Sequence, residues 1–140
     1  MQACYFAINI NQLCNMKENL YKVLTPQEWQ IANATGTITT ELDSKDGFVH
    51  LSNASQLSAT LALYFSDYNE VILLLLELKI IKDKLIYEAV NPRSTRSGKF
   101  AHLYAALKLQ HISKSWILRR EAFAIPQDIL LEAEMDMLAD

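Results

Sequence analysis

The sequence predicts an α+β fold in a single domain around one hydrophobic core. Apolar runs of strand length are interspersed with segments that carry helix caps, and no regular βαβ repeat is present. The chain has 140 residues, of which 51% are hydrophobic and only three are glycine. This composition is typical of an ordered globular domain and differs from that of a disordered chain.

A short strand and a capped helix open the predicted domain. Residues 21–24 suit a strand, and the stretch Thr-Pro-Gln-Glu at 25–28 offers a capping threonine, a proline for the first turn and a glutamate that completes a capping box. The helix should begin at Pro26 and stop at Gly36, because glycine readily ends helices. An extended or turn-rich connection is expected over residues 37–46.

A second strand and helix are predicted next, followed by a core strand. Residues 48–51 form the strand, and Ser52 or Asn53 caps the helix, with Gln56 completing a box-like pair with Asn53. The run 70–78 is apolar with charged ends, which indicates a buried strand. The apolar face expected for the helix consists of Ala54, Leu57, Leu61, Leu63 and Tyr64.

The last third of the chain predicts strands, a polar loop and a final helix. A turn or single helical turn at 80–84 leads to a strand at 85–90, and the composition of residues 91–99 indicates a loop. A strand or short turn follows at 100–107, and alternating side chains predict a half-buried strand at 111–120. The final helix opens at Pro126 and has an apolar face of Ile129, Leu130, Ala133 and Met137.

Charge is segregated along the chain, although the net charge is only −3. Residues 89–120 contain seven basic and no acidic side chains, whereas residues 121–140 contain six acidic and no basic ones. The local basic segment says more about partners than the average charge does. The acidic end could fold back on the basic segment or form the solvated face of the last helix.

Membrane insertion, secretion and disulfide bonding are not predicted. The longest apolar run, residues 71–76, is far shorter than the roughly 20 residues that span a bilayer. No lysine or arginine precedes residue 17, so we expect no signal peptide and a cytoplasmic protein without membrane contact. Cys4 and Cys14 match no metal or redox spacing and are expected to be reduced thiols.

His50 stands inside an apolar run, in the stretch DGFVHLS at 46–52. One interpretation is a buried histidine that bonds to the nearby backbone. The other is a strand that delivers His50 and Ser52 to one face of the sheet, because residues i and i+2 point the same way. The helix start that follows would add unpaired N–H groups for an anion.

His102 and Tyr104 repeat this i, i+2 geometry in the stretch FAHLY. Zinc held by His50, His102 and His111 is an alternative, but no HxxxH, HExxH or CxxC spacing supports it, and we predict no metal. A serine–histidine nucleophile is equally unsupported. Ser52 lies in no GxSxG elbow, and no motif places an acid behind either histidine.

Arg93, Arg96 and Lys99 recur at three-residue spacing in the loop 91–99. Guanidinium groups bind phosphate and carboxylate well, so the loop is a candidate phosphate clamp, and a solvated surface loop is the alternative. No Walker or GxGxxG motif is present. The basic segment 89–120 leaves nucleic acid open as a partner, but the acidic overall balance and the lack of an RNA-binding motif argue against it.

Several separated motifs resemble those of one family. The stretches YKVLTPQEW, LDSKDGFVHLSNASQ and FAHLYAAL are similar, in order and spacing, to the bacterial domain of unknown function family 952. The resemblance covers about residues 20–120. We therefore divide the chain into an N-terminal extension at 1–19, one domain at 20–125 and an acidic C-terminal helix at 126–140.

The resemblance implies a fold and a ligand. Members of the family look like the ADP-ribosyltransferase fold, a compact split sheet, mixed or antiparallel, with flanking helices and a cleft for a dinucleotide. Many transferases of that fold carry His-x-Ser/Thr on an early strand to hold the adenosine-side ribose of NAD, which implies this role for His50 and Ser52. RNA 2′-phosphotransferases of the same fold rely on arginine and histidine, which points to His102, Arg93 and Arg96.

We therefore expect a small nucleotide-binding protein that takes NAD as a substrate and performs ADP-ribosyl or RNA 2′-phosphate transfer. The alternative is a non-catalytic module that binds a small anion or a partner protein, with the acidic helix as a docking element. The sequence leaves the acceptor and the oligomeric state open. The expected catalytic residues are His50, His102 and Arg96, and the expected ligand-binding residues are Ser52, Asn53, Arg93, Lys99, Tyr104 and Glu88.

Overall fold

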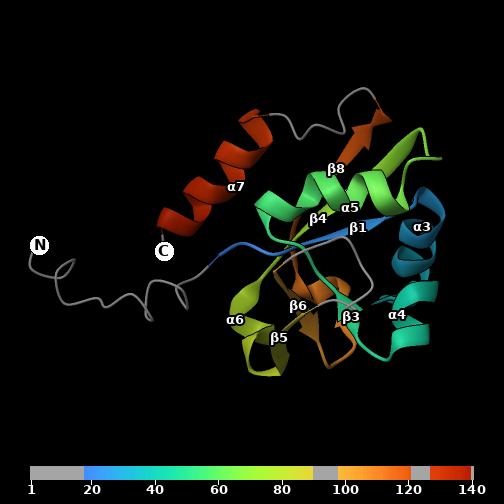
Figure 1. The fold of residues 1–140 in the computed structure, drawn as a ribbon, viewed down its shortest axis with the longest axis horizontal. Helices are drawn as coiled ribbons and strands as arrows, with labels where there is room; N and C mark the ends of the chain where they lie inside the picture. The colour runs from blue at the N-terminus through green and yellow to red at the C-terminus, as the bar shows by residue number, and fades with distance from the viewer. Residues whose placement is uncertain (1–17, 90–97, 121–126, 140) are drawn as a thin grey trace, which may run out of the picture.

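The computed structural model describes residues 18–89, 98–120 and 127–139 (Figure 1). Short strands and helices follow one another throughout this part of the chain. In order they are β1 (Tyr21–Leu24), α3 (Pro26–Thr35), β2 (Thr37–Ile38), α4 (Glu41–Asp46), β3 (Val49–His50), η1 (Ala54–Gln56), α5 (Leu57–Tyr64), β4 (Glu70–Leu76), α6 (Leu78–Ile81), η2 (Lys82–Lys84), β5 (Leu85–Ala89), β6 (Lys99–Leu103), β7 (Leu107–Lys108), η3 (Leu109–His111), β8 (Ile112–Arg119) and α7 (Gln127–Ala139).

All strand pairs of the described residues are antiparallel, and they form three small sheets. The strand orders are β1-β4-β8, β2-β7 and β3-β6-β5. An isolated bridge between Tyr21 and Ser52 joins the first sheet to the third. The α+β class with antiparallel pairing is therefore confirmed, and the strands diverge on either side of this bridge.

Strand β4 lies at the centre of the core because both of its faces are covered. Six of its seven residues are buried, which explains why its sequence is continuously apolar instead of alternating. Leu74 packs in the cluster that includes Ala32 of α3. Leu73, on the other face, packs with Leu61 of α5 and Ala133 of α7, and Figure 1 shows these two helices lying along the same side of the sheet.

Helix α3 begins and ends as its sequence predicts. Oγ1 of Thr25 accepts a hydrogen bond from the Glu28 amide at 3.1 Å, and the Glu28 carboxylate accepts one from the Thr25 amide at 2.9 Å. This is a complete capping box. The helix ends at Gly36, whose φ of 84° lies in the left-handed region that glycine adopts without strain.

The expectation of an extended or turn-rich connection over residues 37–46 is wrong, because most of it forms β2 and α4. Thr40 caps α4 by accepting a hydrogen bond from the Asp43 amide at 3.1 Å, and Gly47 ends the helix. Asp43 is the only buried residue of its six. The helix therefore has no apolar periodicity from which it could be recognised.

The predicted apolar face of the second helix is only half right. Asn53 is the cap and forms reciprocal 3.0 Å hydrogen bonds with Gln56, but the box opens the 3₁₀ turn η1 before α5 begins. Leu61 is buried, whereas Leu63 and Tyr64 are 51% and 53% exposed. Leu63 lies two positions after Leu61, which is about 200° around a helix, and so it faces away from the core.

Helix α7 covers the core beside α5. Ala133 is fully buried, Ile129 packs against the same cluster, and Nδ2 of Asn19 donates to the Ala133 carbonyl at 2.9 Å. Lys114 of the basic segment pairs with Glu132 of the helix at 3.0 Å. The side chain of Met137, predicted on the same face, lies outside the described part of the structure. No helix in the described ranges is long and apolar enough to cross a bilayer.

We expect Leu74→Ala to lower the free energy of unfolding by about 2–5 kcal/mol, because it removes a fully buried side chain and leaves a cavity in a core covered on both faces. Urea unfolding followed by circular dichroism measures this loss. The matched control is Ile117→Ala on the neighbouring strand β8, where the side chain is 65% exposed, and it should change stability by no more than about 0.5 kcal/mol. Equal losses in both variants would contradict the assignment of the core.

Candidate functional site

The site begins where β3 separates from β1. The Leu51 amide donates to the Ala101 carbonyl at 3.1 Å, so Leu51 and Ala101 form a hydrogen-bonded pair of the antiparallel ladder. The neighbouring pair, His50 opposite His102, is therefore a non-hydrogen-bonded pair, in which side chains lie closest and backbone groups point outward. The backbone N–H and C=O of His50 thus face β1, and no strand in the described part of the chain pairs with them there.

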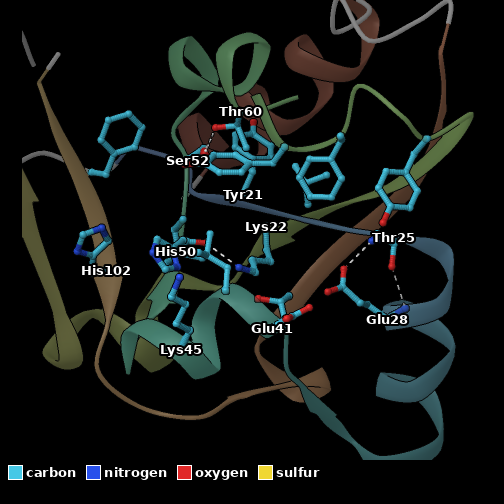
Figure 2. Close-up of a pocket in the computed structure, with 18 residues that line it drawn as sticks. Tyr21, Lys22, Thr25, Glu28, Glu41, Lys45, His50, Ser52, Thr60 and His102 are labelled. Carbon is cyan, nitrogen blue, oxygen red and sulfur yellow. Dashed lines mark hydrogen bonds between the residues drawn. The ribbon is translucent and has the colours of Figure 1, made fainter. Parts of the chain in front are cut away.

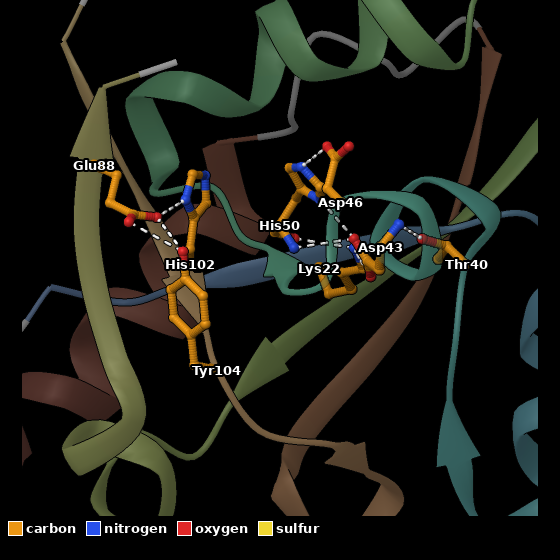
Figure 3. Close-up of polar contacts among 8 residues, drawn as sticks. All are labelled: Lys22, Thr40, Asp43, Asp46, His50, Glu88, His102 and Tyr104. Carbon is orange, nitrogen blue, oxygen red and sulfur yellow. Dashed lines mark hydrogen bonds and ion pairs between the residues drawn. The ribbon is translucent and has the colours of Figure 1, made fainter. Parts of the chain in front are cut away.

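Two side chains replace the missing strand partner. Nζ of Lys22 donates to the His50 carbonyl at 3.0 Å, and Oδ1 of Asp43 accepts from the His50 amide at 3.0 Å. Lys22 comes from β1 and Asp43 from α4, so these contacts tie three elements together at the point where the sheet splits (Figure 3). Buried backbone groups need such partners, because an unpaired one costs about as much as a lost hydrogen bond.

Lys22 and Asp43 also form a buried ion pair, since Nζ lies 2.7 Å from Oδ2 and each side chain is only 6% exposed. Among the described residues, the Lys22 ammonium is the only polar group that compensates the buried Oδ2 of Asp43. Burial lowers the pKa of Lys22 against the opposing effect of Asp43. Burial also acts to raise the pKa of Asp43, but the hydrogen bond from His50 and the charge of Lys22 outweigh it, so the pKa of Asp43 lies below its ordinary value.

The His50 ring is held at both nitrogens by carboxylates. Nδ1 lies 2.6 Å from Oδ1 of Asp43, and Nε2 lies 2.9 Å from Oδ2 of Asp46. Asp43 is buried and rigidly placed, whereas Asp46 is partly exposed at the end of α4. The ring itself is 28% exposed, so it reaches solvent from a fixed position.

The His102 ring has a carboxylate of its own. Nδ1 of His102 lies 2.5 Å from Oε2 of Glu88, and the Tyr104 hydroxyl donates to the same carboxylate at 2.8 and 3.0 Å. The hydrogen bond from His102, followed by that from Tyr104, lowers the pKa of Glu88. The same carboxylate raises the pKa of Tyr104. Glu88 is thus an acceptor that orients the ring of His102 in β6 and that of Tyr104, the residue after β6.

An aromatic ring fixes the spacing of this group. Phe48 stacks on His102 with centroids 4.1 Å apart and lies 4.7 Å from His50. The two imidazoles stand edge to face with centroids 5.4 Å apart. The separation and tilt of the histidines therefore follow from strand register and from one shared packing partner.

Both histidines line a pocket of about 410 Å³ (Figure 2). One wall consists of β1 and β3, and aromatic side chains from the end of α5 and the turn after it form another. Oγ of Ser52 lies 2.8 Å from Oγ1 of Thr60 and joins the segment after β3 to α5 inside the pocket. In Figure 2 the histidines lie at one end and Glu28 at the other. The aromatic lining residues are Tyr21, Tyr64, Phe65, Tyr68 and Phe100.

The structure brings together three of the residues that the sequence singles out, His50, Ser52 and His102. Two others, Glu88 and Tyr104, lie behind His102 and are not among the residues that line this pocket. Their roles in binding or catalysis stay predictions. The spatial convergence of the two histidines is nevertheless a property of the described structure.

The remaining predicted residues do not line the pocket or are not described. Asn53 uses its side chain as a helix cap, and Lys99 is exposed at the start of β6, with its carbonyl accepting from Gln56 Nε2 at 2.9 Å. Arg93 and Arg96 lie outside the described residues. Within the described ranges, no group of three or more histidine, cysteine, aspartate or glutamate side chains is placed to hold a metal ion.

Sequence reasoning misses the carboxylates behind His50 and the lysine beneath them. Asp43 and Asp46 belong to the helix that the sequence conceals, so their proximity to His50 could not be inferred from spacing. The signal that was available is the pair of caps at Thr40 and Gly47, which together bracket a helix of six residues.

Comparison with known proteins places the chain among relatives of similar fold. The family model described as "Protein of unknown function (DUF952)" matches residues 23–115, which confirms the family resemblance. The crystal structure of CC0527 from Caulobacter crescentus is 32% identical, with a TM-score of 0.69 over 81% of this chain and 98% of CC0527. Its solution structure gives a TM-score of 0.63 over 78% and 91% of the two chains. No curated protein matches the chain.

We expect Asp43→Ala to lower the free energy of unfolding by about 3–5 kcal/mol, because the variant leaves the buried Lys22 ammonium without a counter-ion. Urea unfolding at neutral pH measures this loss. The control is Asp46→Ala, which removes only a partly exposed partner of the His50 ring and should cost about 1 kcal/mol or less. A small effect of Asp43→Ala would show that the pair does not hold the split sheet together.

Stability should also depend on the protonation of Asp43. Its pKa is depressed in the folded protein, so its contribution is complete above the pKa of the unfolded chain, about 3.9, and is lost as the pH falls below that value. We expect the unfolding free energy to fall more steeply below about pH 4 in the wild type than in Asp43→Asn. Identical slopes of stability against pH in the two proteins would contradict this assignment.

Proposed function

The chain belongs to the DUF952 family of proteins of unknown function, and we propose that it binds a nucleotide of the NAD or ADP-ribose type in the pocket between β1 and β3. The observation that carries this proposal is the pairing of His50 with His102 across two strands, both lining that pocket. Polar groups that converge on a partly apolar hollow are the usual mark of a small-molecule site.

The lining of the pocket suits the parts of such a ligand. Its volume of about 410 Å³ falls within the range of roughly 300–1,000 Å³ that is usual for ligand sites. Aromatic rings such as Tyr64, Phe65 and Phe100 can stack on a base or a pyridine ring. The Ser52–Thr60 hydroxyl pair can hydrogen-bond to ribose hydroxyls, and the His50 ring lines the same pocket.

We further propose that the fold is of the ADP-ribosyltransferase type. The split between β1 and β3 and the position of His50-Leu51-Ser52 at that split support this assignment. The chain leaves β5 at Ala89 and returns at Gly98, two residues before Phe100 of the pocket. Arg93 and Arg96 belong to this connection, and we assign them to the phosphates of the ligand.

The charges around the histidines favour ADP-ribosyl transfer over phosphoryl transfer. The described carboxylates of Asp43, Asp46 and Glu88 contact the two rings. The Lys22 ammonium balances one of them and a doubly protonated His50 ring would balance another, which leaves one negative charge in excess. An excess of fixed negative charge stabilises a developing positive charge such as an oxocarbenium-like ribose. Phosphoryl transfer passes through an anionic transition state, which these carboxylates would not stabilise.

One observation favours the non-catalytic alternative, in which the pocket binds a small anion or a partner protein. Glu88 is engaged by His102 and Tyr104 and is not among the residues that line the pocket. It is therefore not placed to contact a ribose there directly. Nicotinamide release separates the two candidates, since only the enzyme cleaves the nicotinamide–ribose bond.

We expect NAD or ADP-ribose to raise the melting temperature of the wild type, because a ligand at 100 times its Kd stabilises the native state by about 2.7 kcal/mol. His50→Ala should abolish the shift, since this ring lines the pocket. The matched control is His111→Ala, whose ring accepts from the Lys108 amide and does not line the pocket. Thermal denaturation with NAD, ADP-ribose and a 2′-phosphorylated nucleotide measures the effect, and no shift with any of them would refute the nucleotide assignment.

A further inference from the structure

The two histidines of the pocket differ in their hydrogen bonding, and the difference assigns them different roles. We propose that His102 is the general base of the site, oriented by Glu88, and that it accepts the proton of an acceptor hydroxyl. His50 is then a fixed cationic group that does not exchange this proton. This inference rests on the proposed function, because it names the class of acceptor that the transfer would use.

His50 has no free nitrogen in this arrangement. Its Nδ1 faces Asp43 and its Nε2 faces Asp46. Ionised carboxylates only accept hydrogen bonds, so a ring that satisfies both must carry a proton on each nitrogen. A ring that donates at both positions is an imidazolium and has no lone pair with which to take up a further proton.

His102 is bound at one nitrogen only. Nδ1 donates to the Glu88 carboxylate, which favours the tautomer with its proton at Nδ1 and the lone pair at Nε2. None of the described residues is a hydrogen-bond partner of this Nε2. In Figure 3, Glu88 and His50 lie on opposite sides of the His102 ring. The ring edge that carries Nε2 is therefore turned towards His50 and away from the Glu88 carboxylate.

The ring is also held still and sheltered. Phe48 stacks on its face at 4.1 Å, and the side chain is only 6% exposed. Glu88 in turn is fixed by one bifurcated hydrogen bond from the Tyr104 hydroxyl to its two oxygens. A carboxylate that orients a histidine, which then activates a hydroxyl, is a recurrent arrangement for general-base catalysis. Glu88 acts here as a positioning residue.

The proposed step balances as follows. The acceptor oxygen forms a bond to the anomeric carbon of the nicotinamide ribose, and the bond from that carbon to the pyridinium nitrogen breaks. Nicotinamide leaves with the electron pair and is neutral. The hydroxyl proton moves to Nε2 of His102 and then to water. A base is needed only if the acceptor carries a proton, so the site suits hydroxyl acceptors, water included, rather than carboxylates.

The first test needs no substrate. Nitrogen-15 chemical shifts of the imidazoles at pH 7 should show His102 with a proton at Nδ1 and an unprotonated Nε2, and His50 protonated at both nitrogens. Glu88→Gln should weaken the preference of His102 for this tautomer. A proton at Nε2 of His102, equal states of the two rings, or no response to Glu88→Gln would overturn the assignment.

The second test separates a base from a binding group. With NAD as the probe and water as the acceptor, His102→Gln should lower nicotinamide release by roughly 10²–10⁴-fold. Azide carries no proton to remove, so azide-dependent release by the same variant should stay within a few-fold of wild type. His50→Gln should lose both activities, and His111→Gln should lose neither.

The outcomes also distinguish this inference from the proposed function. Equal loss of both activities in His102→Gln would mean that the ring only binds, and the inference would fail while the function stands. A wild type that releases no nicotinamide would refute the transferase. The imidazole spectra would then decide alone whether His102 is the proton acceptor of the pocket.

Discussion

The arrangement of the site depends on how one residue of β3 satisfies its backbone after the sheet divides. The amide and carbonyl of His50 point towards β1, which has already diverged, and the side chains of Lys22 and Asp43 supply the missing partners. A lysine is almost never buried without an anion, and Asp43 provides that anion from a separate helix. The two side chains thus replace the backbone hydrogen bonds that a neighbouring strand would make to His50. The pocket lies beside them, between β1 and β3.

Other features of the pocket follow from this use of side chains in place of a strand partner. Asp43 reaches the backbone of His50 and, through the same oxygen, the Nδ1 of its ring. The group that closes the strand edge therefore also orients the imidazole. Strand pairing with β6 then sets His102 opposite His50, and Phe48 packs against both rings. Stability and the geometry of the site share one set of contacts, so a change at Asp43 affects both.

The sequence predicts those parts of the site that depend on local periodicity. The shared face of His50 and Ser52 follows from the two-residue repeat of a strand, and both line the pocket. Helix α3 could be bounded from its caps alone. The opposition of His50 and His102 could not be derived in the same way, since it depends on the pairing register of strands that are more than 50 positions apart. Asp43 and Asp46 were missed because their helix buries one side chain and has no apolar stripe.

The direct opposition of His50 and His102 has a consequence for how such a chain can diverge. Side chains alternate between faces along a strand, so inserting or deleting one residue within β3 or β6 would turn one imidazole to the far side of the sheet. The connection between Ala89 and Gly98 joins strands that are already paired, and a longer or shorter connection moves neither ring. A change in the length of this connection would therefore leave the spacing of the two imidazoles unchanged, whereas a one-residue change within either strand would separate them.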